Sequence, residues 1–188
     1  MKRKFALILF FPLLFSNARA QVKTDHYTER FFSALNSYNG TLLKNMQGFD
    51  FVFRNTAVLQ QGVTNETAFE AFFINAQRYR KQYIIKKVMN AEQRKLLVEE
   101  QGEYLRALGV AYPEFIFNLA QDEQGKLGTL DIDTTKNYPA YRRQLHEKSE
   151  RFESWRKKKM LQAGGLEKYG DAHPEHLSII LKEYEKER

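Results

Sequence analysis

The chain has no cysteine among its 188 residues. It therefore has no disulfide bond, no thiolate nucleophile or metal ligand, and no cysteine for a lipid anchor. A domain without disulfides must be held together by packing alone, and a chain of this length can bury a core without such cross-links. Exported domains without cysteine are more typical of a bacterial envelope than of an animal secretome, where small domains are often disulfide-rich.

An excess of positive charge is nearly absent once the first 20 residues are set aside. The whole chain has 30 Lys and Arg residues and 23 Asp and Glu residues. Four of the basic residues and none of the acidic ones lie in residues 1–20. The remainder therefore has 26 basic and 23 acidic residues, a net charge of +3. Nucleic-acid-binding domains usually carry a strongly basic, clustered face. We therefore expect no nucleic-acid partner.

The motifs of common catalytic sites are missing as well. There is no Gly-x-Ser-x-Gly turn of the serine hydrolases and no Glu-x-x-His pair for a di-iron bundle. Gly125-Lys126 lacks the flanking residues of a phosphate-binding loop. Glu99 and Glu103 would share one helix face, where a solvated acidic surface is the simpler interpretation. We expect a protein that is not an enzyme and that uses no cofactor, and we keep an enzyme of unidentified class as an alternative.

Two segments resemble metal sites only in part. Residues 122–133 have carboxylates at both ends, like a calcium loop, but Gln124, Lys126 and Leu127 stand where ligands and a sharp-turn glycine are needed. His173 and His176 could share a helix face, but a zinc site needs a further ligand, for which only Glu147 or Glu150 is at hand. We therefore expect no metal.

The first 20 residues have the order of a secretory signal peptide. Residues 2–4 are basic, residues 5–15 are apolar, and Ala18-Arg19-Ala20 provides the small residues that signal peptidase requires. The apolar run is shorter than the roughly 20 residues of a membrane-spanning helix. The sequence predicts a cleaved signal peptide at 1–20, a mature domain at 21–188 that begins with Gln21, and a periplasmic or secreted protein.

Most of the mature domain is predicted to be helical. Aromatic and aliphatic residues recur every three or four positions, as on the buried face of a helix. We expect a helix over 24–36, which residues 41–47 could resume after Asn39-Gly40, and further helices from 64 to about 87, from 90 to 109, from 113 to about 121, from 139 to 163, and from 171 onward. A strand at 49–54 is an alternative that we do not prefer, because no partner strand is evident and a lone strand is unstable.

Residues 122–136 break this helical pattern with two glycines and several acidic residues, which predicts one long loop. The expected fold is therefore a single all-α domain, a five- to six-helix antiparallel bundle or a set of helical hairpins. The residues expected to be largely buried in it are Phe72, Tyr79, Leu97, Leu108, Phe152 and Trp155.

Two neighbouring segments have opposite charge. Residues 78–95 are mostly basic and residues 99–133 are mostly acidic. Such segments most simply pair with each other, here as antiparallel helices, because charge runs are usually solvated or paired. Docking of a partner on the basic segment is the alternative.

The abundance of aromatic residues, 15 Phe and 10 Tyr, suggests binding. Basic and aromatic residues together can contact proteins or anionic surfaces. Two such groups are candidate partner-binding residues: Arg78, Tyr79, Arg80, Lys81, Tyr83 and Lys87, and then Trp155, Arg156, Lys157 and Lys158.

We expect an exported, non-enzymatic binding protein of the cell envelope, either a chaperone-like factor or an adaptor or subunit of an envelope or secretion apparatus. Its partner would be an envelope or exported protein, and peripheral contact with an anionic membrane surface is allowed. The alternative is a carrier that holds a small apolar ligand in a bundle cavity lined by Phe69, Phe73 and Phe115. The oligomeric state stays open.

Overall fold

The computed structural model describes residues 22–57, 65–162, 164–170 and 174–188. The predicted signal peptide lies outside the described residues. The elements, in chain order, are α1 (His26–Asn36), α2 (Gly40–Met46), β1 (Gln47–Asn55), α3 (Asn65–Arg78), β2 (Gln82–Asn90), β3 (Lys95–Gln101), α4 (Glu103–Leu108), β4 (Glu114–Gln121), β5 (Leu127–Thr134), α5 (Tyr138–Met160), α6 (Gly165–Tyr169) and α7 (Pro174–Glu187).

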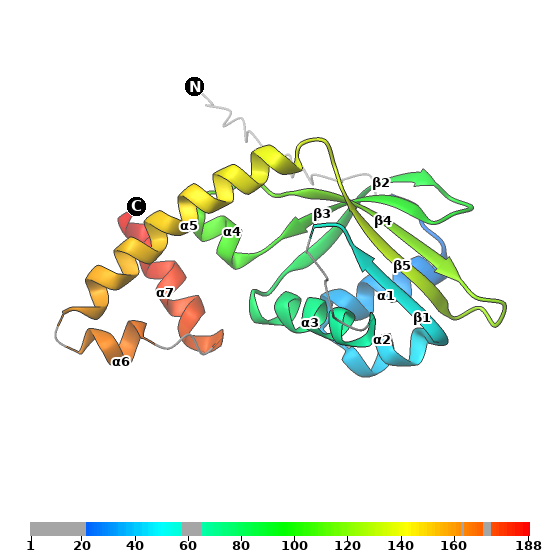
Figure 1. Cartoon of the computed structure of the whole chain (residues 1–188), viewed down its shortest axis with the longest axis horizontal. Helices are drawn as coiled ribbons and strands as arrows, with labels where there is room; N and C mark the ends of the chain where they lie inside the picture. Colours follow the sequence, from blue (N-terminus) through cyan, green and yellow to red (C-terminus); the bar gives the residue numbers. More distant parts are fainter. Residues whose placement is uncertain (1–21, 58–64, 163, 171–173) are drawn as a thin grey trace, which may run out of the picture.

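The centre of the fold is a mixed five-stranded sheet in the order β1-β5-β4-β3-β2 (Figure 1). β1 pairs with β5 in parallel, and the other three pairings are antiparallel. The prediction of an all-α helical bundle was therefore wrong. Helices predicted at both ends of the chain are present, but the middle of the chain forms the sheet.

Residues that were assigned to helices form strands because their buried positions alternate. In β4 the side chains of Phe115, Phe117 and Leu119 are buried while the residues between them are not. β3 buries Leu96 and Val98 in the same way. A period of two is the signature of a strand with one covered face. The four-residue spacing from Phe115 to Leu119 fits this period as well as a helical one.

The two segments of opposite charge do pair, but as antiparallel strands. β2 supplies the basic side and β3 the acidic side, with Tyr83 opposite Glu100 and Ile84 opposite Glu99. Lys86 Nζ lies 3.2 Å from Glu99 Oε2 across this hairpin. The paired interpretation of the charge pattern was correct, and its helical geometry was wrong.

The predicted long loop at 122–136 is mostly strand β5. Only a tight turn precedes it, where Gly125 has a φ of 74°. Asp122 Oδ1 accepts hydrogen bonds from the backbone N–H groups of Gln124 and Lys126, at 2.9 and 2.8 Å. This side chain therefore holds the turn together, which accounts for the acidic residue at the start of the segment.

The strand that we did not prefer at 49–54 is part of β1. Its partner is β5, with Phe53 opposite Leu130 and Asn55 opposite Ile132. The partner is 77 residues further along the chain, so no local pattern indicates it.

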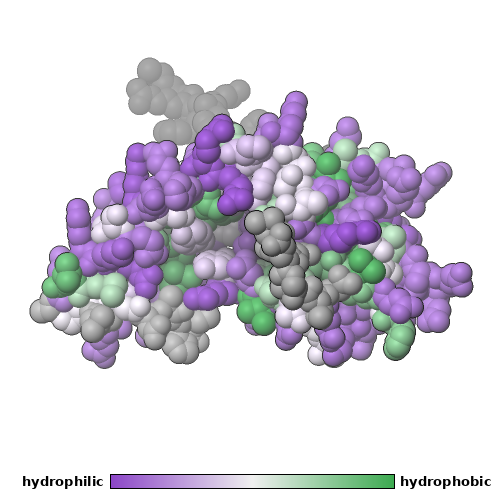
Figure 2. Space-filling model, viewed as in Figure 1, coloured by the Kyte–Doolittle hydropathy of each residue, from purple (hydrophilic) through white to green (hydrophobic). Residues whose placement is uncertain are grey.

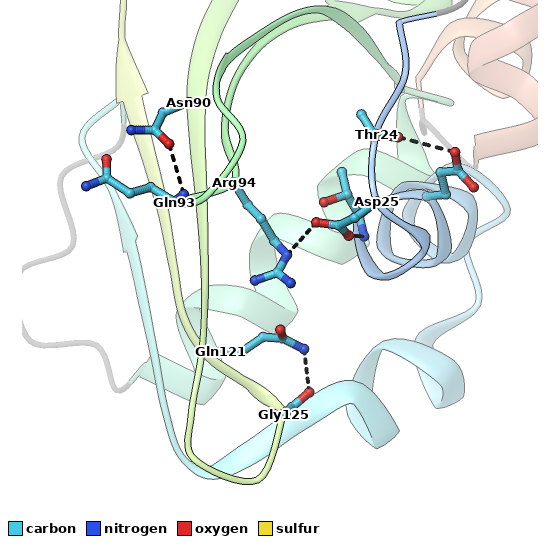
Figure 3. Close-up of polar contacts among 9 residues, drawn as sticks. Thr24, Asp25, Asn90, Gln93, Arg94, Gln121 and Gly125 are labelled. Atoms are coloured by element: carbon cyan, nitrogen blue, oxygen red, sulfur yellow. Dashed lines mark hydrogen bonds and ion pairs between the residues drawn. The ribbon is translucent and has the colours of Figure 1, made fainter.

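The N-terminal end of helix α1 contacts the turn between β2 and β3. Asp25 caps the helix by accepting a hydrogen bond from the Thr28 N–H at 2.8 Å. The second carboxylate oxygen of Asp25 accepts a hydrogen bond from Arg94 Nε at 2.8 Å (Figure 3). The Arg94 guanidinium also lies over the Tyr27 ring. Asn90 Oδ1 accepts a hydrogen bond from the Gln93 N–H within the hairpin turn, 3.1 Å away.

Buried apolar residues form two cores. The first lies between one face of the sheet and helices α1, α2 and α3, and it includes Phe31, Phe53, Phe117 and Leu130. The second joins α4, the C-terminal part of α5, α6 and α7, which we call the helical module, around Phe152. Helix α5 extends from the sheet into the helical module (Figure 1).

Four of the six residues expected to be largely buried are only partly so. Leu108 and Phe152 are fully buried, whereas Phe72, Tyr79, Leu97 and Trp155 are intermediate. Within the described residues, no helix combines the length and the apolar character that crossing a membrane requires.

Candidate functional site

A cavity of about 440 Å³ lies between the sheet, helix α3 and the N-terminal part of α5. Strands β1, β3 and β4 supply its floor through Phe53, Glu100 and Phe115. Helices α3 and α5 supply its walls. We call this space the central cavity, and its volume is in the range of sites for small molecules.

Most of the wall of the central cavity is apolar. Phe53 and Phe115 project from the sheet, and Ala68, Ala71 and Phe72 face them from α3. Small residues at 68 and 71 leave room next to the larger ring of Phe72. Phe72 is half-buried, whereas Phe53 and Phe115 are 1% and 7% exposed. Of the three rings, Phe72 therefore offers the most apolar surface to a ligand with an apolar body.

A buried ion pair lies in the same wall. Lys81 Nζ is 2.9 Å from Glu100 Oε1, and the side chains are 22% and 8% exposed. The alternation of β3 places Glu100 on the covered face of the sheet, beside Val98. Lys81 follows Arg80, whose φ of 48° turns the chain from α3 into β2. Charged groups are rarely buried to this degree unless they are paired.

Tyrosine hydroxyl groups surround the Glu100 carboxylate. Tyr141 and Tyr138, both from the first turns of α5, line the cavity. Burial raises the pKa of Tyr141 above its usual range, and the negative charge of Glu100 raises it further. Tyr83 lies in the core beside Glu100, and burial followed by the same charge raises its pKa well above the ordinary value. These hydroxyls therefore stay protonated and can donate hydrogen bonds at any physiological pH.

Arg142 gives the central cavity a net positive charge. The charged residues in its lining are Lys81, Glu100 and Arg142. The first two neutralise each other, so the charge of Arg142 remains. Arg142 forms no ion pair or hydrogen bond with another described residue, and its charge opposes the rise in the pKa of Tyr138 that burial causes.

A second space of about 230 Å³ lies on the other side of the ion pair, toward the helical module. It shares Lys81, Glu100 and Tyr141 with the central cavity, and Tyr79 and Tyr104 line its far side. The Tyr104 hydroxyl donates a hydrogen bond to Ser149 Oγ at 3.1 Å. The ion pair thus lies between two hollows rather than at the end of one.

The first group of predicted partner-binding residues does not form one surface. Tyr83 is 2% exposed and belongs to the core, and Tyr79 packs against Tyr104. Arg80 Nη1 lies 3.4 Å from Glu103 Oε1, and Lys81 pairs with Glu100. The exposed members are Arg78, Arg80 and Lys87, which lie on three different elements or turns.

The second predicted group lies on α5 in the helical module. Trp155 packs against Phe152 and Tyr184 and donates a hydrogen bond to Glu187 Oε2 at 3.0 Å. Arg156 donates hydrogen bonds to the carbonyl groups of Tyr169 and Gly170, at 2.7 and 2.9 Å. These two residues hold helices together, while Lys157 and Lys158 are exposed.

Sequence reasoning found one member of the central cavity wall among its site residues, Lys81, and missed the others. Glu100 falls in the helix predicted at 90–109 and Tyr141 in the helix predicted at 139–163, and neither was named as a site residue. The signal for Glu100 was present: it stands two residues after Val98 and four after Leu96, in the alternating pattern of a strand. Of the three aromatic residues expected to line a ligand cavity, Phe115 lines the central cavity, whereas Phe69 is in the core and the half-buried Phe73 is not part of the lining.

Among the described residues, no three His, Asp or Glu side chains gather closely enough to hold a metal ion. His173, one of the two histidines considered for zinc, lies outside them. The calcium-like segment that begins at Asp122 is the hairpin turn already described.

The face of the molecule shown in Figure 2 is mostly hydrophilic, with hydrophobic residues in small separated groups. The large hydrophobic side chains exposed among the described residues lie on or next to different elements: Phe49, Ile74, Met89, Leu161 and Ile179. Among the described residues on the face shown in Figure 2, no large uncovered apolar patch is visible of the kind that would favour protein docking.

Comparison with known proteins gives the chain no family. No protein-family model matches the sequence, and no curated protein matches it. An NTF2-like protein of unknown function from Cytophaga hutchinsonii has a similar structure, with 14% identity over 65% of this chain and 98% of its own, and a TM-score of 0.43. An uncharacterised bacterial protein with a cystatin-like fold from Silicibacter pomeroyi shows 13% identity over 70% and 93% of the two chains, with a TM-score of 0.43. Likeness at this level carries no argument about function.

Proposed function

We propose that this chain is a binding protein that holds one small, mainly apolar molecule in the central cavity. The observation that supports it is the cavity itself, with aromatic walls from Phe53, Phe72 and Phe115 around a few polar groups. Small-molecule sites usually combine an apolar lining with a few polar groups that fix orientation. A carrier of a small apolar ligand was the alternative in the sequence analysis; here the sheet, rather than a helical bundle, forms the floor of the cavity.

Docking of a protein on the basic segment is less well supported. Four of its basic residues, Arg80, Lys81, Lys86 and Arg94, are paired with acidic residues. A paired lysine or arginine offers less charge to a partner. Partner binding through the second group remains a prediction, with Lys157 and Lys158 as its exposed residues.

We also propose that the protein acts after export, as its N-terminal residues predict. The intact mass of protein recovered from the cell envelope would then correspond to a chain that begins at Gln21. Recovery of the chain with residues 1–20 in the cytosol would contradict export without affecting the proposal for the cavity.

A neutral fluorescent probe tests cavity binding. N-phenyl-1-naphthylamine emits strongly only in apolar surroundings, and its phenyl and naphthyl groups suit the aromatic walls. We expect saturable binding to the purified protein. Ala71→Phe places a ring into the cavity from α3 and should reduce probe binding at least tenfold.

Ile74→Phe is the matched control, because residue 74 is on the same helix, is exposed and does not line the cavity. It should bind the probe like the original protein, and circular dichroism should show both variants folded. Equal binding by all three proteins, or no binding by the original, would contradict the proposal.

A further inference from the structure

Some polar groups of the central cavity already have partners within the protein, and others remain able to bond a ligand. Lys81 and Glu100 are committed to each other at 2.9 Å. The Tyr138 hydroxyl donates to the Ala57 carbonyl at 3.3 Å. Arg142 and the Tyr141 hydroxyl make no hydrogen bond with another described residue. Both residues line the central cavity from the N-terminal part of α5.

An arginine guanidinium without a protein partner is suited to a carboxylate, since its N–H groups match the two oxygens of that group. A tyrosine hydroxyl that stays protonated can add a donor to the same oxygens. A cationic ligand would meet a net positive lining, in which the one carboxylate, Glu100, already has Lys81 as its partner. The charge of the lining therefore favours an anion over a neutral or cationic molecule of the same shape.

We propose that the molecule bound in the central cavity is an organic acid, whose apolar body lies against Phe53, Phe72 and Phe115 and whose carboxylate is held by Arg142 and the Tyr141 hydroxyl. This inference rests on the proposed function and specifies the chemical class of its ligand. The ion pair of Lys81 and Glu100 is part of the wall and does not bind the carboxylate.

Three probes with the same apolar body test the charge preference: 4-phenylbutyrate, 4-phenylbutanol and 4-phenylbutylamine, each titrated calorimetrically into the purified protein. A charge-assisted hydrogen bond is stronger than a neutral one, and the difference in free energy corresponds to about a tenfold change in affinity. We expect the acid to bind about tenfold more tightly than the alcohol, and the amine to bind most weakly.

Arg142→Gln should weaken the acid about tenfold and leave the alcohol unchanged. Arg143→Gln is the matched control, because Arg143 is also exposed on α5 but does not line the cavity. It should leave both affinities as they are. Since Arg142 has no partner among the described residues, its replacement should not change the thermal melt.

Equal affinities for acid and alcohol would overturn the inference while leaving cavity binding intact. The inference is also overturned if the amine binds most tightly, or if Arg142→Gln and Arg143→Gln weaken the acid equally. Absence of binding by all three probes, together with failure of the neutral fluorescent probe, would overturn the proposed function itself.

Discussion

Replacing Lys81 with Met should destabilise the protein strongly, because it leaves the Glu100 carboxylate buried without a cation. The two groups are 2.9 Å apart, and the Glu100 side chain is 8% exposed. Removal of one partner of a buried pair typically costs about 3–5 kcal/mol. Lys81 is itself 22% exposed, so some water reaches the pair. We therefore expect a loss of about 2–4 kcal/mol in the free energy of unfolding.

The second step is to remove both charges. The double variant Lys81→Met with Glu100→Met fills the same space with apolar side chains, and such replacements of buried pairs are often close to neutral. We expect it to lie within about 1 kcal/mol of the original protein, and therefore well above the Lys81→Met variant. Urea unfolding followed by circular dichroism, on the four proteins of this double-mutant cycle, measures the coupling between the two residues.

The same hairpin offers a matched control. Lys86 and Glu99 are 3.2 Å apart, but their side chains are 40% and 17% exposed. A pair that is this accessible to water contributes about 0–1 kcal/mol, so Lys86→Met should cost less than about 1 kcal/mol. If Lys81→Met costs no more than Lys86→Met, the carboxylate of Glu100 is solvated. The description of the cavity wall as a buried ion pair would then be wrong.

Two further predictions concern the contacts of α1. Replacement of Asp25 by Ala should lower the free energy of unfolding by about 1 kcal/mol or more, because it removes the helix cap, whereas Asp25→Asn keeps the cap and loses only the charge. Burial opposes the lowering of the Asp25 pKa, but the Thr28 N–H and Arg94 lower it nevertheless. The stability that the Asp25 charge contributes is therefore present above pH 4 and is lost as the pH falls, so the acid side of a stability profile should be flatter for Asp25→Asn. Tyr27→Phe should leave stability unchanged or raise it by about 1 kcal/mol at pH 7, because the buried Tyr27 hydroxyl has no hydrogen-bond partner among the described residues. Burial raises the pKa of Tyr27 to about 12, while an unfolded tyrosine ionises near pH 10. The original protein should therefore lose stability between pH 10 and 12, and the Tyr27→Phe variant should lose less. An equal loss in both proteins would show that the Tyr27 hydroxyl is not buried.

The helices that could be predicted from the sequence are those whose signals are local. Helix α1 has its cap at Asp25 and an apolar stripe through Phe31 and Leu35, and α5 begins beside Pro139 where a missing N–H does no harm. Both were expected within a few residues of their observed bounds. Helix α4 ends before Gly109, which adopts a left-handed φ of 64°, as the sequence predicts.

The strands could not be predicted in the same way because each depends on a distant partner. A strand at 49–54 was an alternative, but nothing in these residues indicates that Leu130 would lie beside Phe53 as its partner. The aromatic residues added to the difficulty, since Phe72, Tyr79 and Tyr83 continue one helical spacing across the real end of α3 at Arg78. Tyr83 starts the sheet instead, where Asn36 of α1 binds its backbone N–H and carbonyl groups.

The candidate site exists because residues 95–101 form a strand instead of the predicted helix. In a helix, Glu99 and Glu100 would lie about 100° apart on a water-facing side, and both would pair with neighbouring bases as surface groups. In a strand, consecutive side chains point to opposite faces. Glu99 therefore reaches the outer face, where it meets Lys86, and Glu100 reaches the covered face, where it meets Lys81 and the tyrosines of the cavity. A charge pattern in the sequence can indicate which segments pair, but only the strand geometry determines which of two adjacent carboxylates becomes part of a binding site.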